Sequence, residues 1–218
     1  MMALVAFLAG SCKKSTVETS PLASLNVTNV VVGGKTVKLN SNLVDSATNY
    51  NFKAFGLNAG NTNIYVYPTG DSAHPYFTST VPTSSGGVYS LFLSGNVATK
   101  VDTMLVKESI PVYTDSSCGV RFINLVYNSN PIKVTRSTSP TVTEFSSLSY
   151  RQISAFKTYP ALSTNGTYVF QVRDAVPDTV LATYTLTTPR FFNCTLVWKG
   201  MKGGTGTNAP GVLRVNNY

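Results

Sequence analysis

The sequence predicts an all-β protein built from two antiparallel β-sandwich modules in tandem. No segment carries apolar residues at the helical period over three turns. Short β-branched and aromatic runs instead alternate with Gly, Pro, Asn and Ser, which is the pattern of short strands joined by turns. Similar runs recur at a spacing of about 100 residues, which indicates that one fold is present twice.

The N-terminus has the form of a signal peptide. Residues 1–10 are apolar and uncharged, too few to span a bilayer of ~30 Å as a helix but sufficient for the apolar part of an export signal. The small residues Ala9, Gly10 and Ser11 lie directly before Cys12. We therefore expect a signal peptide over 1–11 and a polar tether over 12–23. The alternative is an ordinary first strand that contains a cysteine by chance.

Small residues directly before a cysteine resemble the lipobox of bacterial lipoproteins. The resemblance implies that the chain is cut before Cys12, whose thiol takes a diacylglycerol and whose new amine is acylated. Several acyl chains make a lasting membrane anchor. The implied location is the cell envelope, on either face of the outer membrane. No Lys or Arg precedes the apolar run, a departure that a start codon farther upstream would explain.

The first module is expected over residues 24–110. Residues 30–32 and 35–39 flank Gly33-Gly34, and this pattern predicts a hairpin, because Gly-Gly supplies the positive φ of primed turns. Five further strands are expected at 50–57, 62–67, 76–81, 88–94 and 101–107.

The second module is expected over residues 118–218, after a polar boundary at 109–117. Its predicted strands are 120–126, 132–136, 150–156, 167–173, 180–186, 192–198 and 212–215. Seven short, closely spaced strands per module are typical of an immunoglobulin-like sandwich. In the strand 192–198, alternation places four residues on one inward face: Phe192, Cys194, Leu196 and Trp198. Trp198, the single tryptophan, is expected in the core rather than on a binding surface.

Three pairs of segments are alike between the two halves. They are 50–55 with 150–156, 63–67 with 167–170, and 91–95 with 196–200.

Three parts of the second half also resemble a known family. They are 120–125 followed by 131–134, 166–173 and 196–200. These segments resemble the domain-of-unknown-function family 4397, which is common as tandem repeats in lipoproteins of Bacteroidota. The resemblance implies a β-sandwich in the envelope and no activity, and the aspartates usual in the family's opening turn are absent.

The residues that catalysis needs are sparse, so no enzyme, metal or cofactor is expected. The single histidine, His74, precedes a proline in a loop, whereas a catalytic triad holds its histidine between nucleophile and acid. No His/Cys spacing fits zinc, and the glycine-rich segment 200–211 lacks the phosphate-loop order, so it is expected to be a flexible loop. The net charge of +8 comes from scattered residues, 17 basic against 9 acidic, which argues against a nucleic-acid partner.

Export would allow Cys118 and Cys194 to form a disulfide. Both cysteines have the parity of inward-facing residues, so two buried free thiols are the alternative.

Four of the six aspartates precede Ser or Thr and then a small or apolar residue. This pattern resembles the O-glycosylation signature of Bacteroidota, and Asx turns are the alternative. The candidate acceptors are Ser46, Ser72, Thr103 and Thr179.

The sequence favours a non-catalytic cell-envelope lipoprotein whose modules contact a protein or glycan partner. The first alternative is a carbohydrate-binding accessory lipoprotein, with Tyr65, Tyr67, Tyr76 and Tyr159 as sugar platforms. It requires these rings to be coplanar and exposed to solvent. The second alternative is a structural surface or matrix component, which would show end-to-end module packing without a pocket.

Overall fold

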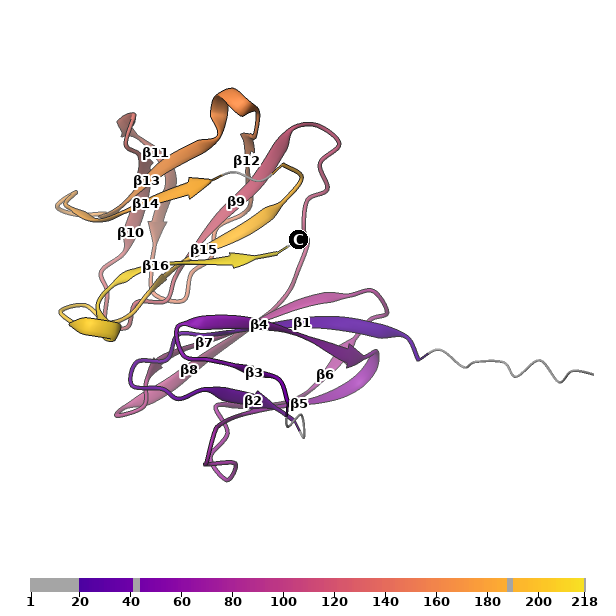
Figure 1. The fold of residues 1–218 in the computed structure, drawn as a ribbon. Coiled ribbons are helices and arrows are strands. Elements are labelled where there is room, and N and C mark those ends of the chain that lie inside the picture. Colours follow the sequence, from indigo (N-terminus) through magenta and orange to yellow (C-terminus); the bar gives the residue numbers. More distant parts are fainter. Residues whose placement is uncertain (1–19, 41–43, 188–189, 218) are drawn as a thin grey trace, which may run out of the picture.

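The computed structural model describes residues 20–40, 44–187 and 190–217 and confirms a nearly all-β protein of two tandem sandwiches (Figure 1). The predicted signal peptide, most of the tether and Cys12 lie outside these residues. Within the described ranges, no helix is both long and apolar enough to cross a membrane.

The first sandwich consists of two four-stranded sheets, ordered β4-β1-β7-β8 and β3-β2-β5-β6. Its strands are β1 (Leu22–Asn29), β2 (Val37–Leu39), β3 (Ser46–Ala47), β4 (Asn51–Asn58), β5 (Gly60–Pro68), β6 (Phe77–Thr83), β7 (Val88–Asn96) and β8 (Lys100–Lys107). All neighbouring strands are antiparallel except β1 and β7, which are parallel.

The second sandwich repeats this topology, with sheets ordered β12-β9-β15-β16 and β11-β10-β13-β14. Its strands are β9 (Ser117–Asn124), β10 (Ile132–Arg136), β11 (Ser139–Leu148), β12 (Lys157–Pro160), β13 (Thr167–Asp174), β14 (Val180–Thr187), β15 (Asn193–Lys199) and β16 (Gly211–Asn216). Two short 3-10 turns, η1 (Ser163–Asn165) and η2 (Gly206–Asn208), precede β13 and β16. The parallel pair is now β9 and β15. Each strand of the first module therefore has a counterpart eight strands later, as a duplication requires.

Equivalent residues perform the same local tasks in both modules. Buried Asn29 and Asn124 end β1 and β9, and each donates its side-chain amide to a backbone carbonyl, at 2.9 Å to Lys35 and 3.0 Å to Leu148. Gly95 and Gly200 have φ of 86° and 107°. A Cβ at either glycine would lie 2.3 or 2.5 Å from a backbone oxygen, so both turns require glycine. Gly95 and Gly200 are the residues that the internal alignment of 91–95 with 196–200 pairs.

The predicted hairpin around Gly33-Gly34 is wrong. Val30 and Val32 continue beyond β1 and donate backbone hydrogen bonds to the Leu93 and Gly95 carbonyls, both at 2.9 Å. The strand β2 belongs to the other sheet and pairs with β3 and β5. The glycines therefore carry the chain from one sheet to the other. Positive φ is recorded at Gly33 but not at Gly34, whereas the predicted primed turn of type I′ needs it at both positions.

The described part of each module has eight strands, where seven were expected. The strand β11 was not predicted because its residues are mostly polar and show no strand pattern. It is an edge strand with Pro140 and several register shifts. Residues 150–156, which were predicted as a strand, are irregular, and the regular strand β12 begins only at Lys157. Arg151, with φ of 64°, is one reason, because a residue in this conformation interrupts a strand.

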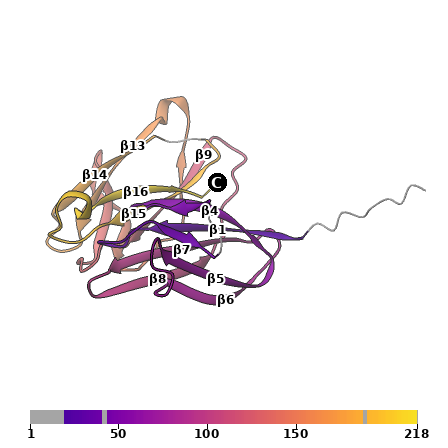
Figure 2. The same ribbon diagram turned by 60° about the horizontal axis from the view of Figure 1, so that its bottom comes forward.

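The two sandwiches pack face to face, so that the four sheets form a stack (Figures 1 and 2). Each sandwich has its own apolar core, and a third core lies between the inner sheets β4-β1-β7-β8 and β12-β9-β15-β16. Its fully buried members are Val30, Phe92, Ile123, Leu125, Val197 and Val215. Strands β7 and β15 are consequently buried on both faces. The face of β15 opposite Trp198 therefore packs against the other module.

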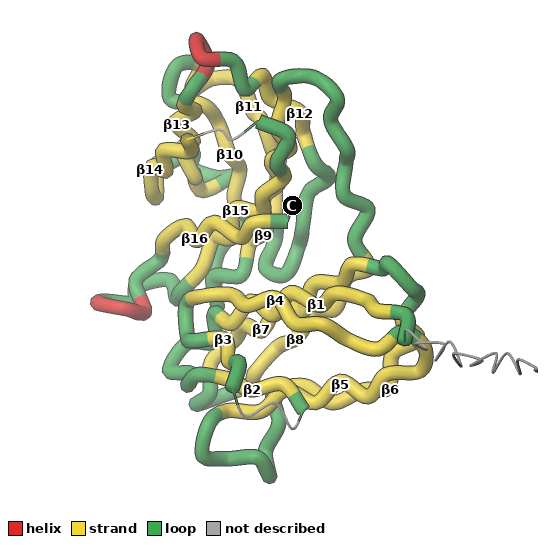
Figure 3. Tube along the Cα trace, turned by 45° about the vertical axis from the view of Figure 1, so that its right-hand side comes forward, coloured by secondary structure: helices red, strands yellow, loops and turns green. Residues whose placement is uncertain are grey.

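Polar contacts surround this intermodule core. The Tyr150 hydroxyl donates to an Asp102 oxygen at 3.1 Å and lies 3.0 Å from the Ser94 hydroxyl, and burial raises the pKa of Tyr150 to about 12. The Arg121 guanidinium donates to a Glu108 oxygen at 2.6 Å, with both side chains almost fully buried. Glu108 belongs to the connecting segment that runs along one side of the molecule (Figure 3). Paired buried charges favour one arrangement because separating them would leave an uncompensated charge.

Removing one large side chain from the intermodule core should destabilise both modules. We expect Phe92→Ala, in the first module, to lower the free energy of unfolding by about 3–5 kcal/mol. Trp198 fluorescence, which reports on the second module, should show this as a lower denaturant midpoint. Phe92→Leu serves as a control that keeps an apolar contact. An unchanged Trp198 midpoint in Phe92→Ala would mean that the modules unfold independently.

Candidate functional site

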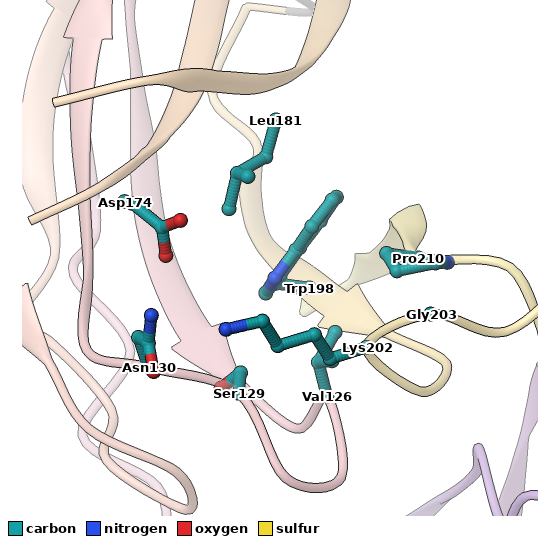
Figure 4. Close-up of a pocket in the computed structure, with 9 residues that line it drawn as sticks. All are labelled: Val126, Ser129, Asn130, Asp174, Leu181, Trp198, Lys202, Gly203 and Pro210. Atoms are coloured by element: carbon teal, nitrogen blue, oxygen red, sulfur yellow. The ribbon is translucent and has the colours of Figure 1, made fainter. Parts of the chain in front are cut away.

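A pocket at one end of the second module brings polar groups and an apolar wall together (Figure 4). Its volume is about 210 Å³. The lining residues come from the loops after β9 and β15 and from the ends of β13, β14 and β15. They are Val126, Ser129, Asn130, Asp174, Leu181, Trp198, Lys202, Gly203 and Pro210.

One wall of this pocket is apolar. Trp198 is 1 % exposed and belongs to the core of the second module, and its indole nitrogen points into the pocket (Figure 4). The indole N–H has no hydrogen-bond partner among the residues that the structure describes. Leu181 and Pro210 extend the wall beside the indole. The expected core residue therefore also supplies a donor to the pocket.

The opposite side of the pocket carries polar groups. Asp174 and Asn130 lie together, and the Lys202 ammonium extends towards them beneath Trp198 (Figure 4). Within the described ranges, none of these three side chains makes a hydrogen bond or an ion pair. A carboxylate, an amide, an ammonium and an indole N–H are thus all available to a ligand.

The glycine-rich segment that carries Lys202 has internal hydrogen bonds. The Met201 amide donates to Asn208 at 3.0 Å, and the Gly204 amide donates to Met201 at 2.9 Å. The Lys202 amide donates to the Asn128 side chain at 3.1 Å. The expected flexible loop thus has a defined path, and this path sets the position of Lys202. The sequence predicted a loop over 200–211, but the convergence of this loop with Asn130 and Asp174 is a tertiary feature.

The proposed tyrosine platform does not form as one surface. Tyr159 is 4 % exposed and its hydroxyl donates to Glu144 at 3.1 Å, so including Tyr159 was wrong. Tyr65 and Tyr67 are half-buried neighbours on β5, with ring centroids 5.6 Å apart and planes inclined at 46°. Tyr76 is partly buried against the first core. Coplanar, solvent-facing rings are therefore not observed among these four.

The four candidate glycosylation sites differ in accessibility. Ser72 is exposed in a turn and Thr179 is exposed in the loop between β13 and β14, whereas Ser46 on β3 and Thr103 on β8 are half-buried. The preceding aspartates all have partners. Asp45 pairs with Lys53 at 2.8 Å, Asp71 with His74 at 2.8 Å, Asp102 with Tyr150 at 3.1 Å and Asp178 with Arg173 at 2.6 Å. The His74 ring is exposed in its loop, and its Nδ1 lies 2.8 Å from an oxygen of Asp71, three residues earlier.

Cys118 and Cys194 are buried free thiols on the adjacent parallel strands β9 and β15. Cys194 is opposite Val120, so the two cysteines are offset by two positions along the same core face. Burial raises the pKa of Cys194 to about 12 and also raises the pKa of Cys118. Both thiols are therefore protonated at neutral pH. No group of three or more His, Cys, Asp or Glu side chains suited to a metal occurs in the described part of the chain.

No protein-family model and no curated protein matches this chain.

Burial should protect both core thiols from alkylation. Because the thiolate is the reacting form, we expect iodoacetamide at pH 8 to modify Cys118 and Cys194 slowly in the native protein and rapidly in denaturant. Raising the pH towards 12 should speed the native reaction at Cys194. Mass spectrometry of a Cys12→Ser chain would measure this. If denaturant exposed no reactive thiol until a reductant was added, the cysteines would instead be disulfide-bonded.

Proposed function

We propose that this protein is a non-catalytic cell-envelope lipoprotein, anchored through Cys12, that binds a glycan through the pocket beside Trp198. The lipobox-like sequence before Cys12 supports the anchor. The resemblance to the domain-of-unknown-function family 4397 supports an envelope location without catalysis. The single observation that carries the binding function is that the polar groups of Asp174, Asn130 and Lys202 face an apolar wall and have no partner among the described residues.

A sugar ring suits both halves of this pocket. Its hydroxyls donate to the Asp174 carboxylate and accept from Lys202 and the Trp198 N–H, while its C–H groups contact Leu181 and Pro210. The volume of about 210 Å³ is below the ~300–1,000 Å³ of sites for drug-sized ligands. One ring at the end of a glycan is therefore the expected occupant, with the remainder of the chain outside.

A protein partner is the alternative that the same pocket favours. A peptide side chain with a polar tip would use the same donors and acceptors, and the pocket opens at the ends of strands, where partner loops have access. A matrix component was expected to show end-to-end packing without a pocket. The modules instead pack face to face, and the second one has a pocket.

O-glycosylation of this exported chain is a further part of the proposal. Ser72 and Thr179 are the favoured acceptors because both are exposed in connections between strands. Ser46 and Thr103 are less accessible in their strands.

Sugar binding should depend on the polar side of the pocket. We expect binding of a monosaccharide or uronic acid to change Trp198 fluorescence, and Asp174→Asn and Lys202→Ala to weaken that binding about 10–100-fold, since a hydrogen bond to a charged group contributes about 1.5–3 kcal/mol. Asp115→Asn, at the other end of the module, is the matched control. If no sugar in a broad panel binds, or if the control weakens binding equally, the glycan assignment fails.

The covalent modifications can be read from one measurement on protein from the membranes of its native host. We expect peptide mass spectrometry to find acyl chains on Cys12, and glycans on peptides containing Ser72 and Thr179. Cys12→Ser should move the protein from the membrane to the soluble fraction. An unmodified Cys12 in membrane-bound protein would contradict the anchor. Unmodified Ser72 and Thr179 would contradict glycosylation without affecting the anchor.

A further inference from the structure

Exposed apolar side chains gather at the end of the second module opposite the pocket. They are Val112, Leu162, Phe191 and Phe192, which are between 46 % and 90 % exposed; we call this set the apolar end. Backbone and side-chain hydrogen bonds hold their three segments together. The Phe191 amide donates to Ser117 at 2.8 Å, the Ala161 amide to Ser116 at 2.6 Å, and the Asn193 side chain to Pro111 at 2.8 Å. Large apolar groups presented together on a surface indicate an interaction site.

The apolar end lies on the side of the molecule where β1 begins. The C-terminal segment lies beside the start of β15, where the Asn217 amide donates to Asn193 at 2.8 Å. Figures 1, 2 and 3 show the C-terminal segment and the start of β1 on the same side of the molecule. The Asn26 side chain also contacts the Asn216 carbonyl, at 3.4 Å. Trp198 and the pocket lie at the far end of β15.

The N-terminal linker is short enough to hold this side close to a membrane. Cys12 is eight positions before Ser20, the first described residue. At no more than about 3.6 Å per residue, this linker spans roughly 30 Å when fully extended. A folded body on such a linker would turn its N-terminal side towards the bilayer, although the linker alone would let it tilt. A second, non-covalent contact is needed to fix the orientation.

The chemistry of the apolar end suits a lipid interface. Phe191 and Phe192 are adjacent and half-exposed, and phenylalanine is among the residues that interfacial elements insert into the headgroup region. Arg190 precedes them, with its Nε donating to the Ala161 carbonyl at 3.2 Å. A cation beside inserted rings attracts anionic lipid headgroups. The net charge of +8 acts in the same direction.

We propose that the apolar end rests on the lipid surface and orients the protein so that the pocket beside Trp198 faces away from the membrane. The proposal rests on the Cys12 anchor of the proposed function. One covalent attachment and one apolar contact together define the orientation. The lipid chains alone, or the Phe191–Phe192 contact alone, would not fix the orientation of the protein on the membrane.

Depth-dependent fluorescence quenching tests this orientation. The chain from Cys12 to Tyr218 is coupled through Cys12 to a maleimide lipid, in vesicles of brominated phosphatidylcholine and phosphatidylglycerol. Phe192→Trp reports on the apolar end, and Val97→Trp reports on the opposite side; both native side chains are 46 % exposed. After subtraction of the Trp198 signal, we expect bromine to quench Phe192→Trp several-fold more than Val97→Trp.

Equal quenching of the two reporters, or no quenching of either, would overturn the proposal. Phe191→Trp replaces Phe192→Trp if the latter does not fold by circular dichroism. A concentration-dependent dimer of Cys12→Ser that Phe191→Ser and Phe192→Ser abolish would also overturn it, because a second copy would then cover the apolar end. Chemical coupling makes the result independent of lipidation in the host. Failure here is thus distinguishable from failure of the Cys12 anchor or of sugar binding.

Discussion

The apolar layer between the two inner sheets determines how the protein is built. Because Phe92 and Val197 fill that layer, the strands β7 and β15 are buried on both faces and the modules cannot turn independently. The polar contacts around it, such as Tyr150 with Asp102 and Arg121 with Glu108, then select one orientation. The two tandem modules are therefore not independent units, because their four sheets form a single four-layer stack. The start of β1, in the first module, and the apolar end, in the second, consequently have fixed positions relative to each other.

Local patterns predicted the faces of strands well but not their partners. Alternation grouped Phe192 with Cys194, Leu196 and Trp198 on one face. The last three lie in the core. Phe192 was placed wrongly, because it precedes β15 and is 46 % exposed. The same pattern could not show that the opposite face meets another module, because burial by a partner sheet leaves no separate periodic signal. The Gly33-Gly34 prediction failed for a related reason. A turn is encoded locally, but the choice between pairing within a sheet and crossing to another depends on residues far along the chain.

The candidate site was beyond sequence reasoning because its groups come from separate segments. Asn130, Asp174 and Lys202 lie in loops or at a strand end, and none belongs to a motif. Individually they are ordinary surface residues. Their convergence follows from the shared topology, which brings the ends of β9, β13 and β15 to one side of the module. The tyrosines chosen for their aromaticity were poorer candidates, since Tyr159 serves the core.

The parallel pairing of the first and seventh strands has a consequence for the time at which each module can fold. Ser24 pairs with Val88, and Gly119 pairs with Asn193, so each central sheet is completed only when nearly all of its module has been synthesised. Contacts this distant in sequence slow folding because the loop must close before they form. A nascent chain therefore remains open until late. The export that we propose would benefit from this delay, because a translocation channel requires an unfolded substrate.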